Sequence, residues 1–142
     1  MTLIQNQSKQ NEPEYYRFQV FQGKRNSQGK LEKTKTVGMT YHKPGQDNYT
    51  MRLWTFVTER FYLLPNHKQG GRYFIMTREP NKNPSAKSKY FWNIVGSGIV
   101  DSAAGVIELE FDLLDKPIYM NIFPEAQAHS VSFADFESNL AA

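Results

Sequence analysis

The chain has 142 residues, with 17 basic and 14 acidic side chains, a net charge of +3 and no cysteine. This length suits one ordinary domain, and the lack of cysteine excludes disulfides, thiolate metal sites and a cysteine nucleophile. There is neither an apolar run long enough for a membrane span nor a signal-peptide pattern, so we expect a cytoplasmic protein of bacterial or phage type.

In chain order, a polar segment rich in Gln and Asn comes first, and it predicts a disordered arm over residues 1–14. A single domain is expected over 15–142. Period-2 alternation and aromatic or β-branched enrichment predict eight strands in it. They are expected at 15–22, 35–42, 49–58, 60–64, 72–78, 90–100, 106–113 and 118–123.

A helix is expected to close the chain over 132–141. Ser132 is followed three residues later by Asp135, which is the spacing of a capping box. Phe133, Phe136 and Leu140 then form one apolar stripe, which predicts that the helix packs against the sheet.

The strands fall into two similar copies, 15–65 and 73–124. Val37-Gly38 matches Val95-Gly96, and at the same spacing Tyr15–Phe18 matches Tyr73–Met76. Phe61–Pro65 matches Met120–Pro124 after a slip of one residue. We interpret this pattern as a tandem duplication. The predicted fold class is therefore α+β, mainly antiparallel β, with two four-stranded repeats forming a pseudo-dimer and a C-terminal helix.

Charge is distributed unevenly along the domain. From Tyr15 to Val100 there are 15 basic and 4 acidic residues, whereas from Asp101 to Ala142 Lys116 is the only base among 8 acids. Such a split suggests one part that faces a polyanion and one acidic part, although two solvated faces of different composition would look the same.

The outer face of the first copy differs from that of the second. Alternation places Arg52 and Trp54 outward where the second copy has Glu110 and Asp112. Cations that neutralise phosphates and aromatic rings that stack on bases are what a single-strand binder needs, although each Trp could equally be a core residue. The candidate nucleic-acid-binding residues are Arg17, Lys24, Arg25, Lys30, Lys33, Lys35, Tyr41, Lys43, Arg52, Trp54, Arg60, Lys82, Lys87, Lys89, Tyr90 and Trp92.

The two Val-Gly pairs, the basic loops before them and the segment Ser132–Leu140 give the chain a topology that resembles the Whirly-like single-stranded DNA-binding proteins. The resemblance implies paired four-stranded sheets with single-stranded nucleic acid running across the sheet surface. It covers residues 15–140 by topology, without a diagnostic motif. The first copy departs from the family because it has no room for a helix of its own.

Catalytic and metal-binding patterns are missing from the sequence. His42, His67 and His129 lack metal-ligand spacing, and Gly96-Ser97-Gly98 lacks the wider spacing of a phosphate loop. We therefore expect a non-enzymatic protein without a cofactor or metal, which binds single-stranded nucleic acid, most readily DNA. The alternative is a protein-interaction or assembly module of a phage or mobile element, which self-associates through its acidic second repeat.

Overall fold

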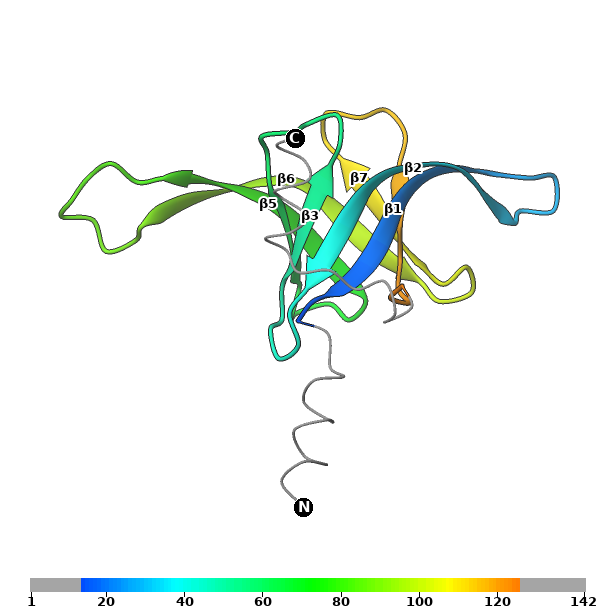
Figure 1. Ribbon diagram of the computed structural model, residues 1–142, viewed down its shortest axis with the longest axis horizontal. Helices are drawn as coiled ribbons and strands as arrows, with labels where there is room; N and C mark the ends of the chain where they lie inside the picture. Colours follow the sequence, from blue (N-terminus) through cyan, green and yellow to red (C-terminus); the bar gives the residue numbers. More distant parts are fainter. Residues whose placement is uncertain (1–13, 126–142) are drawn as a thin grey trace, which may run out of the picture.

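In the computed structural model, which describes residues 14–125, eight antiparallel strands form one closed barrel (Figure 1). Each strand pairs with the next along the chain, and β8 returns to pair with β1. The strands are β1 (Tyr16–Arg25), β2 (Leu31–His42), β3 (Tyr49–Leu53), β4 (Phe61–Pro65), β5 (Arg72–Pro80), β6 (Tyr90–Asp101), β7 (Val106–Phe111) and β8 (Ile118–Asn121).

The expectation of an α+β fold with two four-stranded sheets is wrong. Eight strands occur close to the predicted places, but residues 14–125 contain no helix and the strands form a single sheet. The two halves join because β4 and β5 form a hairpin, in which the Asn66 amide donates to the Arg72 carbonyl at 2.8 Å. The predicted helix over 132–141 and nearly all of the predicted disordered arm lie outside the described residues.

The barrel is filled by side chains that alternate inward along the strands. An eight-stranded barrel has an interior just wide enough for its own side chains to fill, so this interior is a packed core. No helix in the described part of the chain is long and apolar enough to cross a membrane. The buried core residues are Phe18, Val20, Met51, Leu53, Phe61, Leu63, Ile75, Ile107, Leu109, Phe111, Ile118 and Met120.

Two hairpins are longer than the barrel and project from it as arms. β1 and β2 have 10 and 12 residues, and β5 and β6 have 9 and 12, whereas β3, β4, β7 and β8 have 4 to 6. Among residues 14–125, the excess length has no neighbouring strand on its outer edges, and the arms point in opposite directions (Figure 1). We call residues 23–33 the first arm and residues 78–92 the second arm.

The pairing of the first four strands is repeated by the last four. Gly38 lies opposite Leu53 in β3, and Gly96 lies opposite Phe111 in β7. At both glycines an added Cβ would lie 2.3 Å from a carbonyl oxygen of the neighbouring strand, that of Arg52 or that of Glu110. The two copies thus share a close backbone approach that only glycine permits. A tandem duplication would produce this pattern, and common ancestry stays a prediction.

In the first and fourth strands of each copy, the residues that occupy equivalent places in the barrel are not the residues that align by sequence spacing. Val20 and Ile75 occupy equivalent places opposite the two glycines, so Val20 corresponds to Ile75 and not to Arg78. Leu63 corresponds to Met120 and not to Ile122, because these residues lie opposite Tyr49 and Ile107. The second shift is by two residues, which keeps inward-facing apolar positions inward and therefore preserves the sequence pattern. The first is by three residues, at a place where both β1 and β5 have a register shift beside the residue opposite glycine, and only the ladder shows it.

We expect Gly38→Ala and Gly96→Ala each to destabilise the barrel by roughly 1–3 kcal/mol, because the new methyl group must push two strands apart. Urea denaturation measures the loss. Gly70→Ala is the matched control, since an added Cβ there meets nothing within 4 Å. Equal stability of all three variants would contradict the close approach.

Candidate nucleic-acid interface

The second arm carries a cluster of three aromatic rings around one guanidinium group. Arg78 lies 4.2 Å from the ring centroid of Tyr90, 4.9 Å from that of Tyr62 and 5.9 Å from that of Trp92. Tyr62 and Trp92 also meet edge to face at 5.4 Å. The register explains the cluster: Arg78 lies opposite Trp92, and Tyr90 follows on the same face by alternation. We call Tyr62, Arg78, Tyr90 and Trp92 the aromatic–basic face.

Two members of this face are exposed to solvent, Arg78 and Trp92, whereas Tyr62 is buried beneath them and Tyr90 is half-buried. The Trp92 side chain is 42% exposed although it packs against Tyr62, so part of its indole plane remains accessible. A planar ring held in place by a neighbouring ring can receive a nucleic-acid base with little loss of side-chain entropy. Arg78 is also exposed, and its guanidinium group can stack or contact phosphate.

The tip of the second arm is an ordered loop that presents lysines. The Asn81 amide donates to the Lys89 carbonyl at 2.8 Å and closes the hairpin. Inside the loop, the Asn81 side chain accepts a hydrogen bond from the Asn83 amide, and the Asn83 side chain accepts one from the Ser85 amide. These turns hold the backbone, while three exposed cations project from it: Lys82, Lys87 and Lys89.

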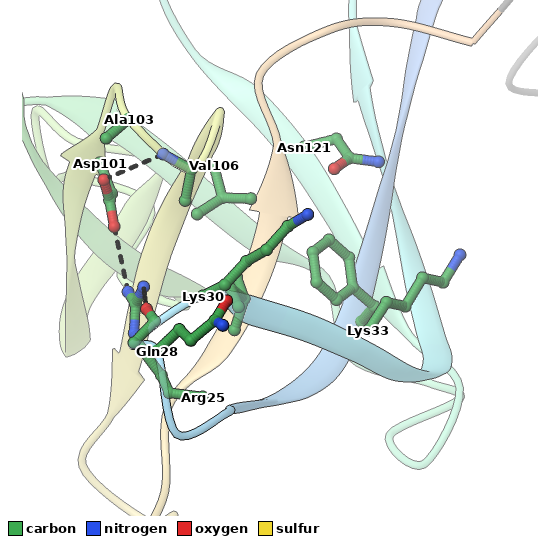
Figure 2. A pocket seen from close by; sticks show the side chains of 12 residues that line it. Arg25, Gln28, Lys30, Lys33, Asp101, Ala103, Val106 and Asn121 are labelled. Atoms are coloured by element: carbon green, nitrogen blue, oxygen red, sulfur yellow. Dashed lines mark hydrogen bonds and ion pairs between the residues drawn. The ribbon is translucent and has the colours of Figure 1, made fainter.

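The first arm is basic as well, and Arg25 joins it to the β6–β7 turn. The Arg25 guanidinium forms a 3.0 Å ion pair with Asp101 (Figure 2). Hydrogen bonds from Arg25 and from the Ala104 amide hold the pKa of the Asp101 carboxyl below its ordinary value. Lys33 donates to the Gln19 side chain and lies 5.8 Å from the Phe21 ring centroid.

Between the first arm and this turn lies a cavity of about 380 Å³. Figure 2 shows the Lys30 side chain extending into it, with Asn121 on another part of the wall. Phe21, Leu31 and Val106 supply its apolar surface. The cavity thus combines a cation with an apolar wall.

The sequence analysis predicted that Arg52 and Trp54 share one exposed face, but the two side chains differ in exposure. Trp54 is 44% exposed, but Arg52 is buried, with 8% exposed. Its guanidinium donates to the Val57 carbonyl at 2.7 Å, so Arg52 holds the β3–β4 loop. The expectation that both residues form one exposed face is therefore wrong for Arg52.

Other predicted residues on the outer surface of β1 and β2 have structural environments too. Arg17 lies 3.5 Å from the Glu125 carboxylate, and the Arg17 carbonyl accepts a hydrogen bond from the Glu125 amide. Tyr41 is buried, and this burial raises the pKa of its hydroxyl. These two side chains are thus part of a packed surface beside the chain segment that follows β8.

The predicted residues do not form one continuous site. The structure groups Tyr90 and Trp92 with Lys82, Lys87 and Lys89 on the second arm, and Lys24, Arg25, Lys30 and Lys33 on the first arm. Lys35 is exposed within β2, Lys43 is exposed directly after that strand, and Arg60, half-buried, precedes β4.

The sequence argument missed Arg78 and Tyr62. Arg78 ends a run of alternating residues in β5, and pairing that strand with the tyrosine–tryptophan strand β6 would have placed it beside Trp92. Tyr62 joins the cluster from β4, through its pairing with Met76 in β5, and no local sequence signal indicates that contact.

No protein-family model matches this sequence, and no curated protein or solved structure is significantly similar to it. The assignment of the site therefore depends on the geometry and chemistry of its own residues.

We expect the Asp101 carboxyl to titrate below the ordinary value of 3.8, and Arg25→Gln to move its pKa upward. A depressed folded-state pKa stabilises the fold above the unfolded value, and this contribution is lost as the pH falls through the folded pKa. Carboxyl carbon shifts in NMR measure the titration, with Lys24→Gln as control. An unchanged Asp101 pKa in Arg25→Gln would show that the ion pair does not form in solution.

Proposed function

We propose that this protein binds single-stranded nucleic acid, with single-stranded DNA as the leading candidate, chiefly through its second arm. The observation that carries the proposal is the aromatic–basic face, an exposed Arg78 and three rings next to a loop with three lysines. Stacking of bases on aromatic rings contributes about 1–3 kcal/mol per base and requires an accessible base plane, which favours single strands over duplexes.

The positive charges of the two arms also favour nucleic acid as the ligand. The loop residues from Pro80 to Phe91 include three lysines and no acid, and the first arm has Lys24, Arg25, Lys30 and Lys33 with Glu32 as its one acid. Each phosphate neutralised by such a cation releases counterions, which favours binding at low salt. The two arms project from opposite sides of the barrel, so one strand held by both would have to pass around the barrel (Figure 1).

The barrel itself supplies a rigid base, and part of its surface is acidic. Glu108 and Glu110 point outward from β7, and Asp112 follows it. These carboxylates repel phosphate, so contact is favoured on the arms. The likeness to Whirly-like proteins stays a prediction, and the contact proposed here differs from theirs because it uses the arms and not the sheet surface. A cytoplasmic location belongs to the same proposal.

Trp92→Ala should weaken binding of a fluorescein-labelled oligothymidine by roughly tenfold or more, because it removes one stacking surface worth about 1–3 kcal/mol. Fluorescence anisotropy measures the change. Trp92→Phe should retain most of the affinity, since it keeps a flat ring. The control is Phe123→Ala, an aromatic residue that is 70% exposed but lies outside the arms. If Phe123→Ala and Trp92→Ala behave alike, stacking on the second arm is not the mode of binding.

The salt dependence of binding should identify the lysines that contact phosphate. Lys87→Ala is expected to lower the slope of log K against log salt concentration by about 0.7, the value for one phosphate contact on a single strand. Lys116→Ala, which alters an exposed lysine of the β7–β8 loop, should leave the slope unchanged. Wild-type affinity that does not vary with salt would eliminate the electrostatic part of the proposal.

A further inference from the structure

A second candidate surface lies at the root of the second arm and has a different chemistry. It is a groove of about 650 Å³ between the arm, the β3–β4 loop and the residues that follow β7. Phe56, Phe61 and Phe111 line its inner part. Leu113 and Ile94 border it and are 80% and 59% exposed. Apolar side chains of this size, exposed together around a groove, are typical of a surface that another molecule covers.

The rim of the groove is acidic. Glu59, Glu79 and Asp112 line it, and Glu110 and Asp115 line the adjoining cavity together with Lys116. The cation among the residues that line the groove is Arg78, whose guanidinium lies over the rings of the aromatic–basic face. Carboxylates around an apolar floor repel nucleic acid and favour an occupant with apolar side chains and positive charges.

The second arm itself has that composition. Its tip carries Lys82, Lys87 and Lys89, and Phe91 next to the tip is 56% exposed. Phe91 lies opposite Glu79, so it points away from the face that holds Trp92. The arm cannot fill the groove of its own molecule, because Arg78–Pro80 and Ile94–Val95 are part of the groove wall. A matching arm has to come from another molecule.

We propose that the groove receives the second arm of another copy of this chain, and that two copies exchange arms reciprocally to form a two-fold symmetric dimer. Phe91 of each arm enters the apolar groove, and the lysines of its tip meet the acidic rim. Because the arm and the groove adjoin each other, one two-fold axis satisfies both contacts and closes the assembly. Tyr90 and Trp92 lie on the other side of the arm and stay open, whereas the tip lysines belong to both contacts, so an oligonucleotide and the partner's rim compete for them.

Sedimentation equilibrium at micromolar concentration without nucleic acid tests the proposal directly. Wild type is expected at twice the 16.5-kDa chain mass, with dissociation increasing at high salt. Leu113→Asp should shift it to the monomer mass, and because Leu113 is exposed the substitution does not disturb the core. The matched control is Phe123→Asp, at an exposed apolar position outside the groove, which should remain dimeric.

A charge-exchange experiment identifies the occupant. Asp112→Lys places a cation on the groove rim, and the double variant Lys87→Glu, Lys89→Glu places acids on the arm. Each protein alone should dimerise more weakly than wild type, because the substitutions replace attraction between tip and rim with repulsion at the changed positions. Mixed together, they should form a heterodimer, since one contact is wild type and the other has its charges exchanged.

Three results would overturn the proposal. They are a monomeric wild type, a dimer that persists in Leu113→Asp, and a failure of the two charge variants to associate when mixed. A monomeric wild type that still binds oligothymidine in a Trp92-dependent way would refute the dimer while leaving the proposed function intact. A stable dimer that binds no oligonucleotide would refute the proposed function and leave the dimer proposal intact.

Discussion

Closure of the sheet between β1 and β8 is the constraint on which the rest of the structure depends. The pairing that closes the ring is short, with Val20 opposite Met120 and Phe21 opposite Tyr119. Beyond it, β1 continues with no partner on that side and pairs with β2 alone. A barrel whose short strands have 4 to 6 residues cannot contain hairpins of 9 to 12, so the excess length leaves it as arms. The arms have no neighbouring strand on their outer edges among residues 14–125, and most of their side chains are exposed, which suits the lysines and asparagines at their tips.

The two halves of the barrel have equivalent backbone pairing but different surface side chains. Trp54 and Asp112 occupy equivalent places, since their amides donate to the carbonyls of Val37 and Val95 at 3.0 and 2.8 Å. The inward neighbours of these positions are both apolar, because the core demands it. Outward positions need not be apolar, and at this one the first half has the Trp54 indole whereas the second half has the Asp112 carboxylate. At this pair of positions the two halves therefore share the backbone pairing and differ in the chemistry of the exposed side chain.

The sequence predicted those features that have a local signal. Alternation and turn residues such as Pro44-Gly45 located eight strands, because one face of each strand is buried. The sequence did not predict barrel closure, because β1 and β8 are far apart in the chain and their pairing produces no local sequence pattern. Burial of Arg52 was missed for a related reason: alternation indicates which side of the strand it occupies, but not that the Val57 carbonyl accepts its hydrogen bond. The cluster around Arg78 required the register of three strands, and the sequence specified none of these registers.

The second arm illustrates what a two-stranded ribbon can do that a covered sheet cannot. Its side chains alternate between two solvent-facing surfaces, so Trp92 and Phe91, adjacent in sequence, point to opposite sides. On the Trp92 side, Arg78 and two tyrosines create a cationic aromatic surface, whereas the Phe91 side continues into an apolar groove bordered by carboxylates. Opposite charge on the two sides separates their ligands, because a phosphate backbone is attracted to one and repelled by the other. Both surfaces depend on the register between β5 and β6, and the close approach at Gly96 helps to hold that register.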